Sequence, residues 1–470
     1  MTAAGRADRL PLSTALGFAV ASLPLQALLI AVAVHLPAYF AANVGVSLAV
    51  VAAAFGTVRL IDVPIEPALG LAMDRGRTRF GRYRLWSLAG APLLMLGLYM
   101  LLIAPEGVGV GYLIAWLMVM YLGHSILMLA HQAWASTLAR SYDDRARLFG
   151  VMGFMGVVGA VSVLAIPIVM ERMGYPDAEG IRAMIWYLIA LAPLAVAVVV
   201  WRTPEPRWVE PHASRFRARD YLEILVDPSM LRILLADLAL SLGPGWMAAL
   251  YLFYFRDGLG FGAGQANLLL AIAIFAGLIG APSMAWLATR ISKHRTVMVA
   301  AVTYSLLLVA LAFAPRGSFA IVLPIMFLAG CCMSGFTVLT RAMTADVADE
   351  MRLRQGKERS GLLYAMTTLT SKFASGASIF LTFNVLAAVG YDPKIGEANT
   401  PAATRALEVA FLSGPIVFVM LGAVCLVGYR LTAERAAEVR RQLDARDALG
   451  DAPPPDAAPA GAGLPLEAPT

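Results

Sequence analysis

Charged residues are scarce in this sequence. Only 14% of its 470 residues are charged, whereas soluble proteins average roughly a quarter. Hydrophobic residues make up 59% of the chain, and its mean hydropathy is +0.72. A compact soluble domain of this length could not bury so much apolar surface. The composition therefore excludes an ordinary soluble enzyme, a disordered scaffold and a nucleic-acid binder, and it indicates a polytopic membrane protein.

Cysteines and catalytic motifs are scarce as well. Cys331, Cys332 and Cys425 lie in apolar runs and lack the spacing of metal ligands, so neither a disulfide nor a metal site is predicted. The sequence also lacks a phosphate-binding loop and an HExxH zinc motif. Active transport by such a chain would draw on an ion gradient and not on ATP. We expect no enzymatic activity, no metal and no cofactor apart from a coupling ion, H⁺ or Na⁺.

Long apolar runs dominate the rest of the chain. A bilayer core of about 30 Å needs about 20 apolar residues in a helix, because backbone groups in lipid must hydrogen-bond internally. Twelve segments qualify: 11–38, 47–73, 85–104, 109–139, 148–170, 181–201, 232–256, 265–289, 297–314, 318–341, 360–389 and 405–429. We therefore expect an all-α membrane protein of twelve transmembrane helices in two six-helix, pseudo-symmetric bundles.

The domain boundaries follow from a polar stretch, rich in arginine and proline, that divides the twelve segments evenly. We expect an N-terminal bundle at 1–201, a cytoplasmic central loop at 202–231 and a C-terminal bundle at 232–430. Proline, alanine and glycine dominate the end of the tail at 431–470, which we expect to be cytoplasmic and largely disordered.

The basic residues alternate between the two sides of this arrangement. With both termini on one side, that side collects 29 of the 37 Lys and Arg residues, and the opposite side collects six. The positive-inside rule then places both termini in the cytoplasm. The same rule accounts for the arginine-rich loops more simply than recognition of lipid or nucleic acid. Arg59 and Lys372 are the two remaining basic residues and fall inside predicted helices.

Three charged residues interrupt the second apolar segment. Asp62 and Glu66 are four residues apart, so both carboxylates lie on one helix face, and Arg59 lies one turn before Asp62. Pro64 and Pro67 remove backbone donors and free carbonyl groups nearby. Two close carboxylates in a low dielectric share a proton or hold a cation, so we predict a coupling-ion site. The alternative is a structural Arg59–Asp62 pair beside a neutral Glu66.

Two further charges lie within predicted helices of the second half. Lys372 is about twelve residues from a helix end, roughly 18 Å, which disfavours snorkelling to the interface. The acids of the second segment are its expected partners if the halves face each other across a cavity. Asp237 either faces that cavity, or caps a helix or pairs with a loop arginine.

The fourth segment carries imidazole and indole groups. His124 and His131 are seven residues apart on one face, and Trp134 follows. An imidazole can carry protons or bind a substrate, and Trp134 could stack on a ligand. Polar packing between helices is the alternative for all three residues. His35, at the far end of the first segment, favours an interfacial position.

Three stretches resemble the glycoside–pentoside–hexuronide:cation symporters, the melibiose permease group of the major facilitator superfamily. The first is RLIDVPIEPALGLAMDRGRTRFGRYR at 59–84, and the second, ADVADEMRLRQGKERSGLLYAMTTLTSKFASGAS, begins at Ala345. Lys372 falls on the intramembrane lysine of the family. HQAWASTLARSYDDRARL resembles its fourth helix, with Trp134 on a tryptophan used by sugar-carrying members. The cytoplasmic-loop positions implied by the first two stretches are Gly70, Asp74, Arg75, Gly81, Arg84, Asp346 and Asp349.

The resemblance implies the major facilitator fold, alternating access and symport with Na⁺, Li⁺ or H⁺, with Asp62 and Glu66 as cation ligands. Sugar-carrying members also place an acid in helix 1, an acid before the helix 4 tryptophan and an arginine in helix 5. This chain has neither the first acid nor the arginine, and it has Ala130 and His131 before Trp134. Fewer cavity ligands, with Glu66 for the usual aspartate, favour H⁺ over Na⁺.

We therefore predict a cation-coupled secondary transporter of a small organic solute. One alternative keeps the fold and changes the cargo to a lipid-like or amphipathic molecule, or the direction to export. Another is a membrane receptor or assembly factor that has lost transport. We expect a monomer in a bacterial cytoplasmic (inner) membrane, in contact with lipid and a small-molecule substrate and without nucleic acid.

Overall fold

Every segment of regular structure that the computed structural model describes is helical. The described residues are 10–75, 81–139, 142–205, 224–355 and 360–450. The first half contains α1 Leu12–Ala19, α2 Ser22–Ile30, η2 Ala31–His35, α3 Leu36–Ala42, α4 Leu48–Arg75, α5 Tyr83–Leu102, α6 Val110–Leu138, α7 Tyr142–Arg172 and α8 Asp177–Arg202. The second half contains α10 Pro228–Phe253, η3 Tyr254–Gly258, α11 Ala263–Ile291, α12 Lys293–Ala312, α13 Phe319–Gln355, α14 Ser360–Ala388, η4 Gly396–Ala398, α15 Pro401–Cys425 and α16 Ala433–Gly450.

Eleven helical spans among the described residues are long and apolar enough to cross a membrane. They coincide with eleven of the twelve segments expected from the sequence. The twelfth segment is α14, which carries Lys372 and eight serine and threonine residues. Those polar side chains lower its hydropathy, although α14 runs through the bundle beside α4 and α10. The fold is therefore an all-α membrane fold of the expected kind, and the twelfth segment, interrupted by polar side chains, carries the intramembrane lysine.

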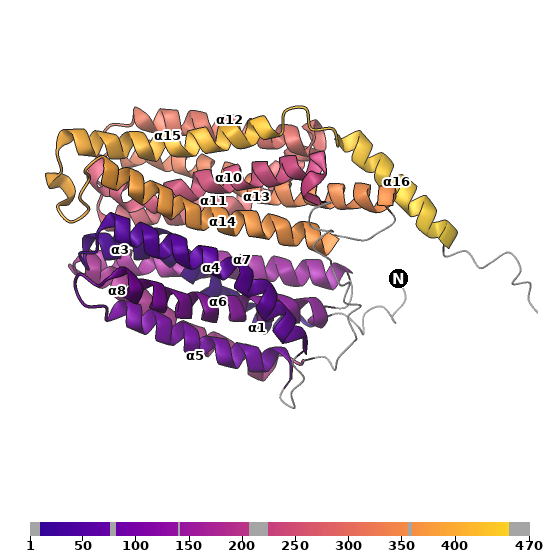
Figure 1. Ribbon diagram of the computed structural model, residues 1–470, viewed down its shortest axis with the longest axis horizontal. Helices are drawn as coiled ribbons and strands as arrows, with labels where there is room; N and C mark the ends of the chain where they lie inside the picture. The colour runs from indigo at the N-terminus through magenta and orange to yellow at the C-terminus, as the bar shows by residue number, and fades with distance from the viewer. Residues whose placement is uncertain (1–9, 76–80, 140–141, 206–223, 356–359, 451–470) are drawn as a thin grey trace, which may run out of the picture.

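The two halves of the chain form two groups of roughly parallel helices (Figure 1). The indigo-to-magenta helices of the first half lie together, and the orange and yellow helices lie against them. Two pairs of helices join the groups side by side, α4 with α14 and α7 with α11, and α10 also packs on η2 and α3. These pairs decide which side chains of the two halves can meet.

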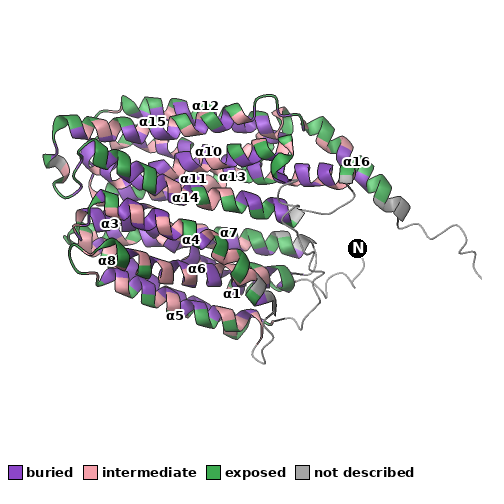
Figure 2. Ribbon diagram, viewed as in Figure 1, coloured by how far each residue is buried: buried purple, intermediate pink, exposed green. Residues whose placement is uncertain are grey.

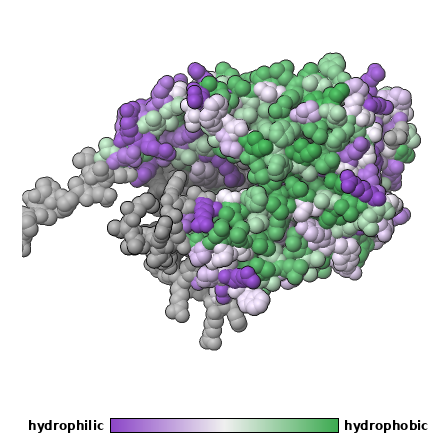
Figure 3. Space-filling model, turned by 180° about the vertical axis from the view of Figure 1, so that it is seen from behind, coloured by the Kyte–Doolittle hydropathy of each residue, from purple (hydrophilic) through white to green (hydrophobic). Residues whose placement is uncertain are grey.

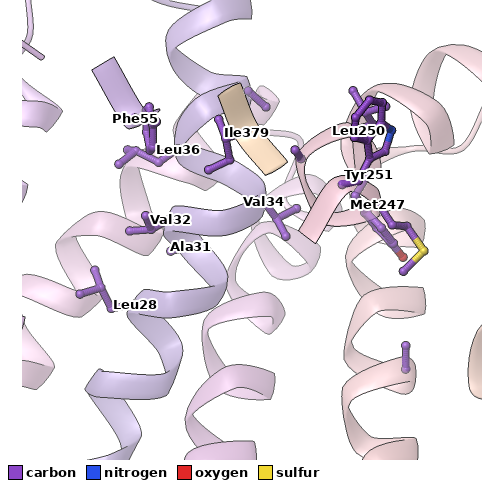
Figure 4. Packing of buried hydrophobic residues seen from close by; sticks show 14 of the residues in the cluster. Leu28, Ala31, Val32, Val34, Leu36, Phe55, Met247, Leu250, Tyr251 and Ile379 are labelled. Atoms are coloured by element: carbon purple, nitrogen blue, oxygen red, sulfur yellow. The ribbon is translucent and has the colours of Figure 1, made fainter. Parts of the chain in front are cut away.

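The apolar core is continuous across both halves. Burial is concentrated on the helix faces that look inward, while the outer faces are exposed (Figure 2). In the close-up, Val34 of η2 points toward α10, where Leu250 and Tyr251 lie, and Phe55 of α4 lies near Ile379 of α14 (Figure 4). Hydrophobic side chains therefore fill the space between the halves at this level and exclude water there.

The first transmembrane segment is less regular than the expected run at 11–38. It extends to Ala42 and divides into α1, α2 and α3, with the π-helical η2 before α3. A π-bulge adds a residue to one turn and re-aims the side chains around it. His35 closes this turn and is buried, with 2% of its surface exposed, and the interfacial position expected for it stays a prediction.

The C-terminal tail also differs from its expectation. Residues 433–450 of the tail form α16, so the prediction of a largely disordered 431–470 is wrong for that stretch; 451–470 lie outside the described residues. Val439 and Leu443 of α16 are buried, and α16 contacts α13. At 37 residues, roughly 55 Å, α13 is longer than a bilayer core and reaches beyond it to meet α16.

The surface of the molecule carries a broad apolar belt. Hydrophobic residues cover the middle of the face shown in Figure 3, and hydrophilic residues gather at both ends of the helices. Such a belt fits a hydrocarbon layer with polar groups at its two boundaries. We call the end where α1 begins and α15 finishes the terminal end, and the opposite end the distal end.

Candidate functional site

The acids of α4 lie in the middle of the molecule. Asp62 and Glu66 stand one turn apart on α4, and Arg59 Nη1 lies 3.6 Å from Asp62 Oδ2. Pro64 and Pro67 lie within the helix, and each takes away the N–H that would bond a carbonyl four residues earlier. The Asp62 side chain is 2% exposed and that of Glu66 is 17% exposed. The Asp62 carboxylate is thus closed off from solvent, while the Glu66 carboxylate keeps some contact with it.

Lys372 reaches these acids from the other half. Its ammonium forms an ion pair with Glu66 and lies 3.7 Å from Asp62 Oδ2. The side chain is 24% exposed, so it does not snorkel to either end of α14. The sequence prediction that Lys372 meets the helix 2 acids across the two halves agrees with this geometry.

Two glycines bring α4 and α14 close enough for that contact. A Cβ at Gly376 would overlap the Arg59 side chain, and one at Gly56 would lie 3.1 Å from the Phe380 ring. Gly376 is one turn beyond Lys372 on α14, so the helices approach most closely beside the ion pair. Small residues serve this purpose in membrane helix packing.

A third helix, α6, completes the cluster: His124 was a candidate from the sequence, whereas Tyr121 and Ser125 were missed. The Ser125 hydroxyl lies 3.2 Å from Asp62 Oδ1 and 3.1 Å from Glu66 Oε1, and its single proton can serve one of them at a time. The Arg59 guanidinium lies 4.1 Å from the centre of the Tyr121 ring, a cation–π contact. His124 stands beside Ser125 on α6 and interacts electrostatically with Arg59 and Asp62.

The sequence contains only a weak indication that Tyr121 and Ser125 belong to the site. Tyr121, His124 and Ser125 are spaced by three and four residues, so they share one face of α6. Serine and tyrosine are common in membrane helices, and their spacing alone does not identify the helix they face. Only the packing of α6 on α4 shows that this face meets the acids.

The cluster carries two positive and two negative groups at one level of the bundle. Arg59 and Lys372 balance Asp62 and Glu66, so the four side chains are neutral together when both acids are ionised. Each charge in such a place is costly unless it is paired. A cation or proton that binds one of the acids therefore competes with Lys372 for it.

Asp237 forms a separate polar contact on the other side of α14. Its Oδ2 accepts hydrogen bonds from the Thr370 hydroxyl at 2.6 Å and the Ser371 hydroxyl at 2.9 Å. Asp237 is 7% exposed, on α10. The carboxylate thereby ties α10 to α14 within the second half, and Arg341 also interacts with it electrostatically. The alternatives drawn from the sequence, a position facing the cavity or a pairing with a loop arginine, stay open.

His131 and Trp134 lie away from the charge cluster. His131 stacks on Phe18 with ring centroids 4.4 Å apart, and its Nε2 lies 3.1 Å from the Ser22 hydroxyl. Trp134 is fully buried, and its indole N–H donates to the Pro204 carbonyl at 3.4 Å. In this conformation both rings pack between helices of the first half, as the packing alternative expects, and stacking of Trp134 on a ligand stays a prediction.

The loop motif after α4 is described in part. Gly70, Asp74 and Arg75 belong to the last turns of α4, and a Cβ at Gly70 would meet no atom within 4 Å. Gly81 has a φ of +107°, which favours glycine. Residues 76–80 lie outside the described part of the chain.

Glu205, which the sequence analysis did not single out, organises the start of α5. Its Oε1 accepts hydrogen bonds from the backbone N–H groups of Arg82 at 2.6 Å and Tyr83 at 2.7 Å. Arg84 donates to the Thr203 carbonyl at 2.8 Å. The residues just after α8 thus hold the beginning of α5 at the terminal end.

The second loop motif pairs with its neighbours in the same half. Lys293 lies 2.6 Å from Asp346 Oδ2, and Arg440 of α16 lies 3.5 Å from Asp349 Oδ2. Both acids belong to the extension of α13 beyond the membrane span. These contacts fasten α13 to α12 and α16, and the predicted gating role of Asp346 and Asp349 remains a prediction.

Comparisons with known proteins agree with this architecture. The chain is 23% identical over 443 residues to the isoprimeverose transporter of Lactiplantibacillus pentosus, covering 89% of each protein. It is 22% identical to the uncharacterized symporter YnaJ of Bacillus subtilis (strain 168), covering 92% of this chain and 94% of YnaJ. The crystal structure of the nucleoside transporter NupG shares the fold, with a TM-score of 0.67 at 11% identity, over 89% of this chain and 100% of NupG. The sequence profile of the MFS/sugar transport protein family matches residues 17–433, and the chain belongs to that family.

Proposed function

We propose that this protein is a cation-coupled symporter of a small organic solute that works by alternating access. The ion pair between Lys372 of one half and Glu66 of the other carries the proposal. It joins two groups of helices that must move against each other, and it lies at a place where charges are costly unless they have a role. The names of two relatives, an isoprimeverose transporter and a symporter, point the same way.

The charges suggest how an ion would act on the two halves. A proton on Glu66, or a cation between Glu66 and Asp62, removes negative charge that now binds Lys372. The ammonium is then released from α4, and α14 can move with the second half. Ion binding thereby weakens the contact that α14 makes with the first half, which couples occupancy of the site to the conformational change.

The surroundings of the acids favour H⁺ as the coupling ion. Arg59 and Lys372 both lie within 4 Å of Asp62, and Ser125 supplies the neutral side-chain oxygen. A metal cation would have to push two positive groups aside and gather several oxygen ligands. A proton needs only one carboxylate oxygen, and Glu66 retains access to solvent.

We further propose that the terminal end lies in the cytoplasm of a bacterium, with the protein in the inner membrane as a monomer. The excess of Lys and Arg at that end, 29 against six, is the reason. The site would then be loaded from either side in turn. The substrate remains a small organic solute.

Transport into proteoliposomes tests the proposal. We would load the purified protein into vesicles and follow uptake of labelled glycosides, pentoses and organic acids under an inward H⁺ gradient, an inward Na⁺ gradient or neither. We expect accumulation with the H⁺ gradient and its collapse when a protonophore is added. Accumulation that is indifferent to both gradients would contradict ion coupling, and accumulation with Na⁺ alone would assign the other ion.

A further inference from the structure

At the distal end of the molecule, an acid of one half caps a helix of the other. Glu171 stands at the end of α7 in the first half, and its carboxylate accepts a hydrogen bond from the backbone N–H of Gly264 in the first turn of α11. The first N–H groups of a helix have no partner within it, and they carry partial positive charge. A carboxylate is the natural partner for that position.

The sequence around the α11 start leaves space for this contact. A Cβ at Gly262 or at Gly264 would overlap the carboxylate of Glu171. Gln265, in the same turn, accepts from the Gly262 N–H at 3.3 Å within its own half. At the start of α11, the Gly262 N–H therefore finds its partner within the second half, and the Gly264 N–H finds its partner in the first half.

Two more polar contacts cross the boundary at the same end. Arg256, which precedes α11, lies 3.8 Å from Asp177 at the start of α8. His35 Nε2 lies 2.7 Å from Asn267 Oδ1, and both side chains are buried. Because the Asn267 amide group donates to the Ala263 carbonyl, its oxygen accepts, and the imidazole is the donor.

A small cavity lies among these contacts. It has a volume of about 40 Å³ and lies between α3, α8, α10 and α11, with Ala38, Asp177 and Arg256 in its lining. Water fits into that space, so the boundary between the halves is closed at the distal end but not fully packed. The apolar core between the halves begins on its inner side.

We propose that Glu171 is a positioning residue for transport, which keeps the distal end closed by capping α11 and must release it before that end can open. The inference rests on alternating access as proposed above. Opening the distal end separates α7 from α11, so the Gly264 N–H loses the carboxylate and both groups return to water. The α7–α8 turn, with Glu171 and Asp177, holds the segment that leads into α11, and we call this turn the clasp.

Cysteine labelling of the purified protein in lipid nanodiscs tests the clasp. The native thiols are first replaced by alanine at Cys331, Cys332 and Cys425. Ala38, which is buried in the cavity lining, is then changed to cysteine as the reporter. The rate of its reaction with a soluble maleimide measures how often the boundary between the halves opens at the distal end. All variants are compared at one pH, without Na⁺, a transmembrane gradient or substrate, so a failure of the proposed ion coupling would leave this measurement intact.

We expect slow labelling in the parent and a rate raised about two- to fivefold by Glu171→Ala, with a smaller rise for Glu171→Gln. Gly264→Ala should raise the rate as well, because the new methyl group displaces the carboxylate. Glu179→Gln is the matched control, since Glu179 is an acid of the same region that pairs with Arg182 in its own half. Should Glu171→Ala not fold, the isosteric Glu171→Gln decides.

Three results would overturn the proposal. The first is an unchanged rate in both the Glu171 variants and Gly264→Ala, which would leave the cap without a gating effect. The second is a labelling rate in the parent as fast as that of the denatured protein, which would show that the distal end is open although Glu171 is present. An equal rise in Glu179→Gln would attribute the effect to net charge and would also contradict the clasp.

Discussion

Lys372 of α14 lies between two carboxylates of α4, in contact with Glu66 and 3.7 Å from Asp62. The three residues come from opposite halves of the chain, more than 300 positions apart. The contact therefore depends on where the halves stand relative to each other. Any motion that separates α4 from α14 must break the contact between the Lys372 ammonium and the acids. A proton or cation bound to the acids weakens that contact.

The first prediction concerns this ion pair. Glu66→Gln should abolish accumulation against a gradient, because the neutral amide cannot exchange a proton, and Asp62→Asn should do the same. Lys372→Ala should impair binding or coupling, because it leaves two carboxylates without their ammonium. Uptake into proteoliposomes measures all three. Wild-type accumulation in both acid variants would refute the site, and full activity of Lys372→Ala would make Lys372 structural.

The partnership itself can be measured by a double-mutant cycle. Glu66→Gln combined with Lys372→Met should destabilise the protein less than the sum of the single changes, with a coupling of about 0.5–3 kcal/mol. Thermal unfolding in detergent provides the free energies. Glu179→Gln combined with Lys372→Met is the control, and it should be additive because Glu179 pairs with Arg182.

The second prediction concerns Ser125, which faces both acids. Ser125→Ala removes a hydrogen bond to a charged group, typically about 1.5–3 kcal/mol. We expect the apparent affinity for the coupling ion to change by about tenfold or more, with little change in expression. The ion dependence of uptake measures this shift. Ser162→Ala is the control, because its hydroxyl contacts Tyr187 elsewhere in the first half; equal effects of the two changes would assign Ser125 to packing.

The third prediction separates Asp237 from the ion site. Thr370→Val removes one donor from a buried carboxylate, which costs about 1–3 kcal/mol. Asp237→Ala with Thr370→Val should cost less than the sum of the two, since they act on one contact. Thermal unfolding tests the stability effect. If Asp237→Ala instead kept full stability and lost only transport, Asp237 would be a cavity residue, as one sequence hypothesis held.

The sequence contained enough to predict the fold and the core of the site. Apolar runs and the alternation of basic residues define the helices, and the i, i+4 spacing places Asp62 and Glu66 together. The cost of an unpaired amine in lipid then points from Lys372 to those acids. These inferences need only local spacing and the polarity of the membrane.

Residues whose role depends on packing could not be found in this way. Ser125 and Glu171 are ordinary residues in their own helices, and each matters because of a helix from elsewhere in the chain. His35 ends an apolar run and lies in a π-helical turn, and its contact with Asn267 of the other half could not be read from the sequence. The helix at 433–450 was not predicted, because the proline-rich residues that follow it dominate the composition of the tail.

The fourth prediction tests the close approach that makes the ion pair possible. Gly376→Ala adds a methyl group where the Arg59 side chain already lies, so α14 and α4 must move apart or Arg59 must rearrange. Overpacking of this kind costs about 1–3 kcal/mol. Because Lys372 is one turn away, its contact with Glu66 should weaken, and ion-driven uptake should fall together with the unfolding temperature.

Gly361→Ala on the same helix is the matched control for this change. A Cβ at Gly361 would meet no atom within 4 Å, and alanine inside a helix is favoured over glycine by about 0.5–1 kcal/mol. We therefore expect Gly361→Ala to unfold at the same or a higher temperature and to transport normally. If Gly376→Ala also behaved in this way, α4 and α14 would not need their close contact, and the ion pair would tolerate a wider separation than the proposed coupling allows.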